Sequence, residues 1–162
     1  MFRVAIITAS DSGAAGNRED KSGAVIRERM EREGYEVVSY RLLPDDRAAI
    51  AAELRRICDE NAADLVLTTG GTGFSPRDWT PEATLDVAER LCPGIPEAMR
   101  YSSMQITTRA MLSRAVAAIR GRTLIINLPG SPKAVRENLE AVLPALGHGL
   151  EILTGRAGEC GG

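Results

Sequence analysis

A glycine-rich segment followed by two opposite charges has the residue types best suited to chemistry. It reads Thr68-Thr69-Gly70-Gly71-Thr72-Gly73-Phe74-Ser75-Pro76-Arg77-Asp78, and it follows the apolar run 64–67, which predicts a buried strand. The three glycines permit unusual φ angles and a close approach of the backbone to a ligand. Thr80 and Pro81 then predict the start of a helix, with Thr80 as its N-cap. A glycine loop between a strand and a helix predicts binding of a phosphorylated ligand.

This loop matches neither of two common nucleotide-binding motifs. A Walker A motif needs a Gly-Lys-Ser/Thr ending, whereas the first cation after these glycines is Arg77. A dinucleotide fingerprint needs a later glycine, and Phe74-Ser75-Pro76 stands there instead. The usual phosphate-binding folds are therefore only a weak explanation for the segment.

Three further turns with polar residues follow predicted strands. Their residues are Ser10 and Asp11, then Asp45, then Ser131 and Lys133. Because the carboxyl ends of parallel strands share one edge of a sheet, we expect all four loops to converge there. Carboxylates beside phosphate donors make sense mainly with Mg²⁺, which removes their repulsion of the ligand.

Each of these acids also has a purely structural interpretation. Ser10 and Asp11 suit turn or capping chemistry, and Asp45 suits capping of the helix that follows it. Asp78 suits a salt bridge with its neighbour Arg77 or a cap, although exposed pairs of this kind stabilise little.

The periodicity of the whole chain predicts a three-layer α/β/α fold around a mostly parallel sheet. Two apolar runs joined by Arg120-Gly121-Arg122 predict a hairpin near 115–127, which adds one antiparallel strand. Pro144 must break or kink the last helix. The predicted strands cover 2–9, 35–43, 64–69, 115–119 and 123–127, and the predicted helices cover 20–33, 47–62, 81–90, 96–103, 132–143 and 144–153. We expect a single domain at 1–154 and a flexible glycine-rich tail at 155–162.

Composition narrows the class of protein. The 162 residues carry a net charge of −2, so they lack the basic surface typical of proteins that bind nucleic acid or anionic membranes. The single histidine, His148, lies far from the glycine loop, which disfavours a Ser-His-Asp triad. The three cysteines are scattered, and Cys58 falls on an apolar helix stripe. With no signal peptide and no apolar run of about 20 residues, the expected location is the cytoplasm.

Two long motifs together resemble the MogA/MoaB type of molybdenum-cofactor biosynthesis protein, which includes the G domain of gephyrin. The first is the segment 68–84, Thr-Thr-Gly-Gly-Thr-Gly-x-x-x-Arg-Asp-x-Thr-Pro-Glu-Ala-Thr. The second is Asn127-Leu128-Pro129-Gly130-Ser131-Pro132-Lys133-Ala134. Met111-Leu112-Ser113-Arg114, Ser10-Asp11 and Asp20-Lys21-Ser22-Gly23 are also similar to family signatures. The resemblance extends from residue 2 to about residue 154.

The resemblance implies molybdopterin binding and transfer of an adenylyl group from Mg-ATP, which gives adenylyl-molybdopterin and pyrophosphate. It implies catalytic and metal-handling roles for Asp78 and Asp45. Substrate contacts are implied for Ser10, Asp11, Gly70, Gly71, Thr72, Gly73, Ser131 and Lys133. It also implies Mg²⁺, no tightly bound organic cofactor, a homotrimer or a hexamer of trimers, and a molybdenum insertase as a partner.

Two other functions remain open from the sequence. One is a non-catalytic paralogue that binds molybdopterin as a scaffold, since both kinds occur in the family. The other is a nucleotide pyrophosphohydrolase, because related domains occur in competence-damage proteins. The presence of both Asp45 and Asp78 favours the enzyme.

Overall fold

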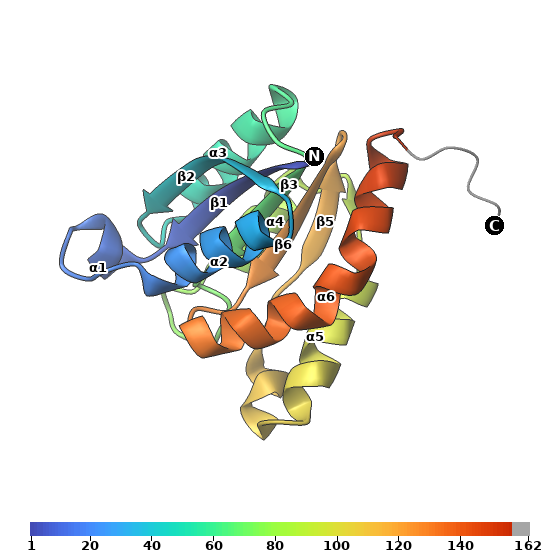
Figure 1. Cartoon of the computed structure of the whole chain (residues 1–162). Coiled ribbons are helices and arrows are strands. Elements are labelled where there is room, and N and C mark those ends of the chain that lie inside the picture. Colours follow the sequence, from blue (N-terminus) through green and yellow to red (C-terminus); the bar gives the residue numbers. More distant parts are fainter. Residues whose placement is uncertain (157–162) are drawn as a thin grey trace.

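The computed structural model describes residues 1–156, in which a central sheet is covered by helices on both faces (Figure 1). The strands stand in the order β2-β1-β3-β6-β5-β4. Their bounds are β1 (Arg3–Ala9), β2 (Glu36–Leu43), β3 (Leu65–Thr69), β4 (Arg90–Leu91), β5 (Ala117–Arg120) and β6 (Thr123–Leu128). The predicted three-layer α/β/α fold is confirmed.

The sheet is parallel from β2 to β6 and changes direction at β5. β1 pairs in parallel with β2 and β3, and β3 pairs in parallel with β6. β5 is antiparallel to both β6 and β4, so the predicted hairpin is confirmed. The short edge strand β4 was not predicted. It begins at Arg90, the last residue of the helix that was expected over 81–90.

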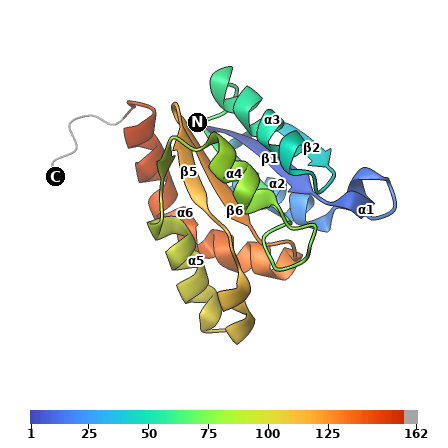
Figure 2. The ribbon, with the colours of Figure 1, turned by 180° about the vertical axis from the view of Figure 1, so that it is seen from behind.

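Each face of the sheet has its own apolar core. Alternate residues of β1 point to opposite faces. Val4 and Ile6 pack on the side of α2 (Lys21–Arg32), α5 (Gly94–Met104) and α6 (Pro132–Leu153). Ala5 and Ile7 pack on the side of α3 (Arg47–Asp59) and α4 (Thr80–Val87), which Figure 2 shows from behind. Cys58 of α3 is buried in this second core, as its position on the apolar stripe predicted.

Side-chain caps fix where most of these helices begin. Asp20 accepts a hydrogen bond from the Gly23 N–H, Asp46 from the Ala48 and Ala49 N–H groups, and Ser131 from the Ala134 N–H. A one-turn helix, α1 (Asp11–Ala14), stands where a loop was expected, with Ser10 as its N-cap. A short 3₁₀ helix, η1 (Thr108–Leu112), follows α5.

Two predicted features of α4 are wrong. Thr80 is not the N-cap but the first helical residue, because the Trp79 carbonyl accepts the first helical bond, from the Ala83 N–H at 2.9 Å, which makes Trp79 the N-cap. The helix ends at Val87 instead of Arg90. Beyond it, the Glu89 and Cys92 N–H groups donate to carbonyls of β5 at 2.9 Å, so pairing at the sheet edge replaces helix formation.

Pro144 kinks the last helix and does not divide it. α6 continues through this proline, which cannot donate a backbone hydrogen bond, and Figure 1 shows the helix bending along its length. After α6, Arg156 stacks on the Phe2 ring at 4.7 Å from the ring centroid. The rest of the predicted tail, residues 157–162, lies outside the described residues.

Candidate functional site

The four predicted loops meet at one edge of the sheet. Ser10 follows β1, Asp45 follows β2, Gly70 follows β3 and Ser131 follows the end of β6. These four strands are parallel, so their carboxyl ends lie together. The Gly130 Cβ position would lie 3.5 Å from Gly70 Cα, which places the two glycine-containing loops in direct contact.

The first two glycines of the loop are required by its geometry. Gly70 and Gly71 have φ values of 90° and 70°, which side chains rarely tolerate. A Cβ at Gly70 would collide with the carbonyl oxygen of Ala9, and one at Gly71 would collide with the Thr80 side chain. The loop therefore lies against the end of β1 and the start of α4 more closely than any other residue would allow.

Three predicted site residues, Asp11, Asp45 and Asp78, lie close together with Arg77. The Asp11 N–H donates to Asp45 Oδ2 at 3.0 Å, and the Asp45 N–H donates to Asp11 Oδ1 at 2.9 Å. Arg77 donates to both oxygens of Asp11, at 2.9 and 3.0 Å. The glycine loop is thus tied to the residues after β1, and those residues are tied to the loop after β2.

The pKa values of the Asp45 and Asp11 carboxyl groups are shifted in opposite directions. Burial raises the pKa of Asp45 above its ordinary value, and the charges of Asp11 and Asp78 add to this rise. The hydrogen bond from Arg77 lowers the pKa of the exposed Asp11. A half-buried acid beside other acids favours binding of a cation at Asp45.

The Asp78 carboxylate is hydrogen-bonded to the main chain of its own loop. Its Oδ2 accepts hydrogen bonds from the Gly73 and Ser75 N–H groups, at 3.1 and 3.0 Å. Arg77 pairs with Asp11 and not with Asp78, and Asp46 caps α3 in place of Asp45. Both acids still accept main-chain N–H groups of neighbouring loops, so each also has a structural part in this edge.

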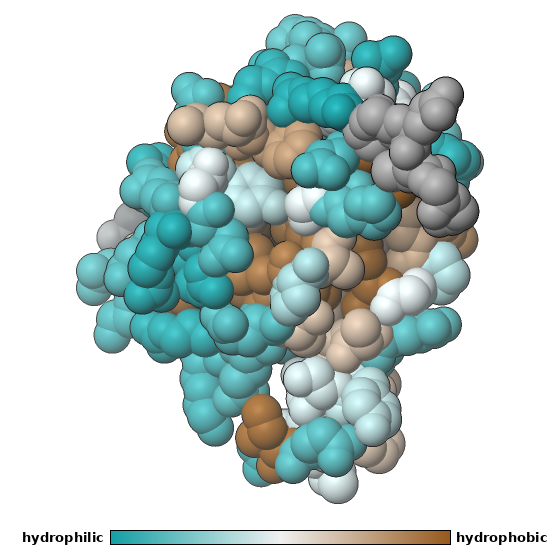
Figure 3. Space-filling model, turned by 45° about the vertical axis from the view of Figure 1, so that its right-hand side comes forward, coloured by the Kyte–Doolittle hydropathy of each residue, from teal (hydrophilic) through white to brown (hydrophobic). Residues whose placement is uncertain are grey.

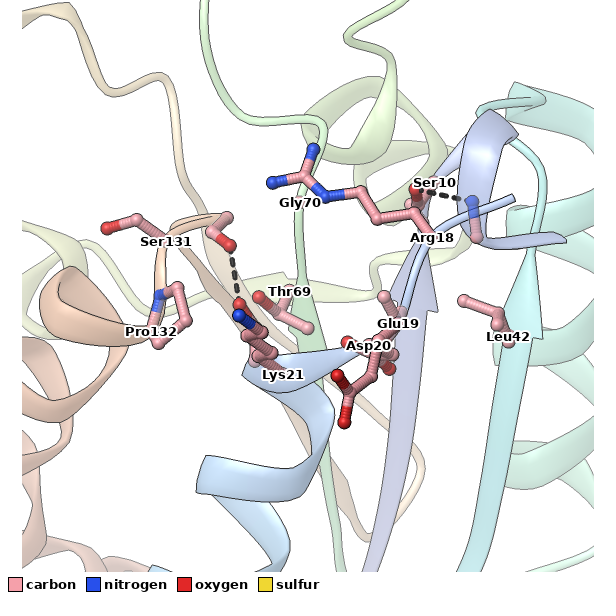
Figure 4. A pocket seen from close by; sticks show the side chains of 15 residues that line it. Ser10, Arg18, Glu19, Asp20, Lys21, Leu42, Thr69, Gly70, Ser131 and Pro132 are labelled. Carbon is pink, nitrogen blue, oxygen red and sulfur yellow. Dashed lines mark hydrogen bonds between the residues drawn. The ribbon is translucent and has the colours of Figure 1, made fainter. Parts of the chain in front are cut away.

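A pocket of about 620 Å³, the large pocket, opens on one side of the glycine loop (Figure 4). Of the predicted residues it contains Ser10, Gly70 and Ser131. Arg18 extends across it in the figure, and Lys21 adds a second cation at the start of α2. Two helix N-termini, those of α2 and α6, reach this pocket. Cations and helix N-termini are groups that hold phosphate.

The lining of the large pocket is fixed by its own hydrogen bonds. Ser22 Oγ donates to Gly130 O at 2.5 Å, and Thr69 Oγ1 donates to Pro129 O at 2.6 Å. Tyr40 donates to Asp20, which also caps α2. Burial, followed by the contact with Asp20, raises the pKa of Tyr40 to about 12.

A second pocket of about 270 Å³, the small pocket, opens further along the loop. Thr72 and Gly73 contribute to its wall, and Met99 adds apolar surface. Its polar groups include Arg109, Glu137 and Asn138. The glycine loop therefore contributes residues to two pockets that differ in size and in chemistry, whereas Asp11, Asp45 and Asp78 line neither.

Lys133 lies apart from both pockets. Its side chain is exposed and lies 3.5 Å from Glu137, one turn further along α6. Sequence reasoning did not single out Arg18, Thr69, Arg109 or Asn138 as site residues. Thr69 ends the predicted strand β3 and belongs to the first motif, which was the signal for it. Arg18 lies in the loop before α2, Arg109 in η1 and Asn138 in α6, and only the fold brings these three to the pockets.

The acids suit a cation that arrives with a ligand better than a resident metal. Within residues 1–156, no cluster of three or more His, Cys, Asp or Glu side chains is arranged to hold a metal by itself. Mg²⁺ commonly binds through one or two carboxylates together with substrate phosphates. Asp45 and Asp78 fit this pattern, because Asp11 is already paired with Arg77.

An apolar surface lies away from this edge, on the side of α5 and α6. Figure 3 shows apolar side chains in the middle of this face with polar ones around them. A pocket of about 380 Å³ opens there, lined by Ile95, Ala98, Val142 and Leu146 among others. Of the helices described, none combines the length and apolar character that crossing a bilayer requires.

Comparison with known proteins places the chain in a family. Residues 5–148 match the model of the probable molybdopterin binding domain. The molybdopterin adenylyltransferase of Helicobacter pylori (strain J99) is 43% identical over 95% of this chain and 89% of its own length. The molybdopterin adenylyltransferase of Escherichia coli K12 is 42% identical over 91% of this chain and 76% of its own length.

Solved structures and a eukaryotic relative agree with this match. The molybdopterin biosynthesis enzyme MoaB of Thermus thermophilus superposes with a TM-score of 0.91 and 52% identity, covering 96% of this chain and 98% of that one. Gephyrin of Dictyostelium discoideum is 41% identical over 94% of this chain, which spans 23% of gephyrin. The chain described here belongs to the molybdopterin-binding domain family.

Proposed function

We propose that the chain is a molybdopterin adenylyltransferase that transfers the adenylyl group of Mg-ATP to molybdopterin. The relatives from Helicobacter pylori and Escherichia coli carry this name, and they match more than nine tenths of the chain. The observation that carries the proposal is that two unlike pockets share residues of one glycine loop, which also contains Asp78 and lies against Asp45. A transfer between two substrates needs such an arrangement, because both must be held next to one reacting centre.

The large pocket suits the nucleotide. Arg18, Lys21 and the N-terminus of α2 provide positive charge and N–H donors for a triphosphate. The small pocket suits the pterin. Glu137 offers acceptor oxygens and Arg109 offers N–H donors for an aminopyrimidinone edge, and Met99 offers apolar surface for a ring.

The reaction needs alignment of charges more than proton transfer. The nucleophile is the terminal phosphate of molybdopterin, a monoester whose second pKa of about 6 leaves it mostly dianionic at neutral pH. One of its oxygens forms a bond to the α-phosphorus of ATP. The bond from that phosphorus to the bridging oxygen of the β-phosphate breaks, and pyrophosphate leaves with the electron pair. No general base is required, which agrees with pocket linings that contain no histidine among the described residues.

Asp45 and Asp78 would hold Mg²⁺ with the triphosphate. The bound ion supplies charge neutralisation between the two anions that must meet. The main-chain N–H groups of the glycine loop and Arg18 add to this neutralisation from the protein. Asp78 remains ordered before the ligand binds, since the Gly73 and Ser75 N–H groups hold one of its oxygens.

A direct assay tests this proposal. Purified protein is incubated with molybdopterin, ATP and Mg²⁺, and adenylylated pterin and pyrophosphate are measured. Equal amounts of both products support the enzyme. Tight pterin binding without product would instead indicate a binding-only paralogue, and ATP cleavage in the absence of pterin would indicate a hydrolase.

The proposal extends to assembly and location. We propose that the chain forms a homotrimer or a hexamer of trimers, for which the apolar surface on α5 and α6 offers one candidate contact. The adenylylated product would pass to a molybdenum insertase. Because the reaction consumes ATP, we place it in the cytoplasm. A mass measurement in solution tests the assembly, and a monomer at micromolar concentration would exclude it.

A further inference from the structure

The guanidinium of Arg114 joins both ends of the loop that contains Asp78. Its Nε donates to Gly73 O and its Nη2 donates to Asp78 O, both at 2.7 Å. Its main-chain N–H donates to Thr72 O at 2.8 Å. One residue thus holds the loop where it leaves the glycines and again where it reaches the acid.

A fourth contact fixes the guanidinium itself. Arg114 Nη1 donates to Glu82 Oε2 at 2.7 Å, and both side chains are partly buried. Glu82 lies in the first turn of α4, the helix that starts just after Asp78. The planar guanidinium is therefore held by the rigid body of the fold on one side and holds the loop on the other.

We propose that Arg114 is a positioning residue that sets where the Asp78 carboxylate stands relative to Asp45 and to the two pockets. Arg114 lines neither pocket, so it acts through Asp78 and not by touching substrate. This inference rests on the proposed function for its effect on turnover, but its effect on the loop is independent of that function.

Geometry explains why an arginine is needed. Two carbonyl oxygens and one carboxylate approach from three directions in the plane of one side chain, and each receives its own N–H. A lysine at this position has one ammonium on a flexible stem, so it cannot hold all three acceptors in that plane. Loss of the two carbonyl contacts frees the loop between Gly73 and Asp78 to move.

The chain offers a matched control in Arg120. This arginine donates to both oxygens of Asp59, at 2.9 and 3.1 Å, and to Val87 O at 3.1 Å. It stands opposite Thr123 at the start of β6, which is the end of the sheet remote from the site. Arg114 and Arg120 therefore have similar numbers of contacts and similar burial, and only Arg114 holds the Asp78 loop.

The sequence also provides a reporter for the loop. Trp79 is its only tryptophan and directly follows Asp78. The indole Nε1 donates to Pro76 O at 3.0 Å, and the Arg47 guanidinium lies 5.8 Å from the ring centroid. Fluorescence of the whole protein thus reports the state of this loop without any assay of activity.

The experiment compares Arg114→Ala, Arg114→Lys and Glu82→Gln with Arg120→Ala, well below the unfolding temperature of each variant. We expect Arg114→Ala to lower kcat about 100-fold, as misplacement of a reacting group by about 1 Å does. The KM for ATP should stay within about twofold, since binding in the ground state is retained. Trp79 should become more accessible to acrylamide. Arg114→Lys should give a kcat and a Trp79 accessibility between those of the wild type and of Arg114→Ala. Glu82→Gln should change both quantities little, because the two carbonyl contacts of Arg114 remain.

Two results would overturn the inference. One is a kcat and a Trp79 quenching constant for Arg114→Ala that equal those of Arg120→Ala. The other is a rise in KM with unchanged kcat, which would make Arg114 a binding residue. If the wild-type protein transfers no adenylyl group, the proposed function fails, and the Trp79 comparison still decides whether Arg114 holds the loop.

Discussion

Asp11 and Asp45, which are 34 positions apart in the sequence, donate their main-chain N–H groups to each other's carboxylates, at 3.0 and 2.9 Å. This reciprocal pair joins the loop after β1 to the loop after β2. The two carboxyl groups differ in pKa, because burial raises the pKa of Asp45 and the hydrogen bond from Arg77 lowers the pKa of Asp11.

Substitution of the two acids should therefore change stability in opposite directions. The pKa of Asp45 in the folded protein lies above 3.8, its ordinary value. The free energy of unfolding therefore falls as the pH rises from 3.8 through the folded-state pKa, and it stays lowered at pH 7. Asp45→Asn should raise the melting temperature at pH 7, by about 2–4 °C for each 1 kcal/mol gained. Asp11→Asn should lower it. Calorimetry from pH 3 to pH 8 checks both, and a lower melting temperature for Asp45→Asn at pH 7 would contradict the assignment.

Neutralising Asp78 should abolish transfer and spare pterin binding. Asp78→Asn keeps an oxygen that can accept from the Gly73 and Ser75 N–H groups, so the loop keeps its shape and loses only the charge. We expect kcat to fall at least about 100-fold, as loss of one electrostatic contact to a transition state does. Asp46→Asn, at a helix cap, serves as the control. Unchanged turnover in Asp78→Asn would refute the role of this acid.

A methyl group at Gly70 should damage the fold as well as the site. The residue has a φ of 90°, and its Cβ would meet the Ala9 carbonyl, so Gly70→Ala should cost about 1–3 kcal/mol. Gly94→Ala is the control, because a Cβ there meets nothing within 4 Å. Urea unfolding of the two variants makes the comparison. Equal midpoints would show that the loop relaxes freely.

The two pockets should separate the two substrates in kinetic measurements. Arg18→Ala, in the large pocket, should raise the KM for ATP about 10-fold and leave that for molybdopterin unchanged, since a charge-assisted hydrogen bond contributes about 1.5–3 kcal/mol. Arg109→Ala, in the small pocket, should raise the KM for molybdopterin and leave the KM for ATP unchanged. Steady-state titration of each substrate checks this. A reversed pattern would exchange the assignments of the pockets.

The sequence predicted the strands and the convergence of the loops because both follow from local patterns. Apolar runs such as 64–67 define buried strands, and parallel strands bring their carboxyl ends together. Ser131 and Pro132 predicted the start of α6 correctly for the same reason. The roles of Asp45 and Asp78 were implied by the resemblance of their motifs to the family, and they stay a prediction.

The features that the sequence did not predict depend on contacts between distant segments. β4 exists only because residues 89–92 meet β5, and no local pattern announces a two-residue edge strand. Thr80 has the chemistry of an N-cap, but Trp79 takes that position, and the Thr80 N–H donates to Gly71 O in the folded chain. Arg114 belongs to one of the family-like motifs, yet its bonds to Gly73 and Asp78 span 41 and 36 positions.

The fate of the α-phosphate tests the central claim most directly. The protein is incubated with molybdopterin, Mg²⁺ and ATP labelled either in the α-phosphate or in the γ-phosphate, with Asp78→Asn alongside. We expect the α label to appear in the pterin product and the γ label in pyrophosphate, and we expect chelation of Mg²⁺ or the Asp78 substitution to stop both. Label from the γ-phosphate in the pterin, or α label released as AMP without pterin, would contradict it.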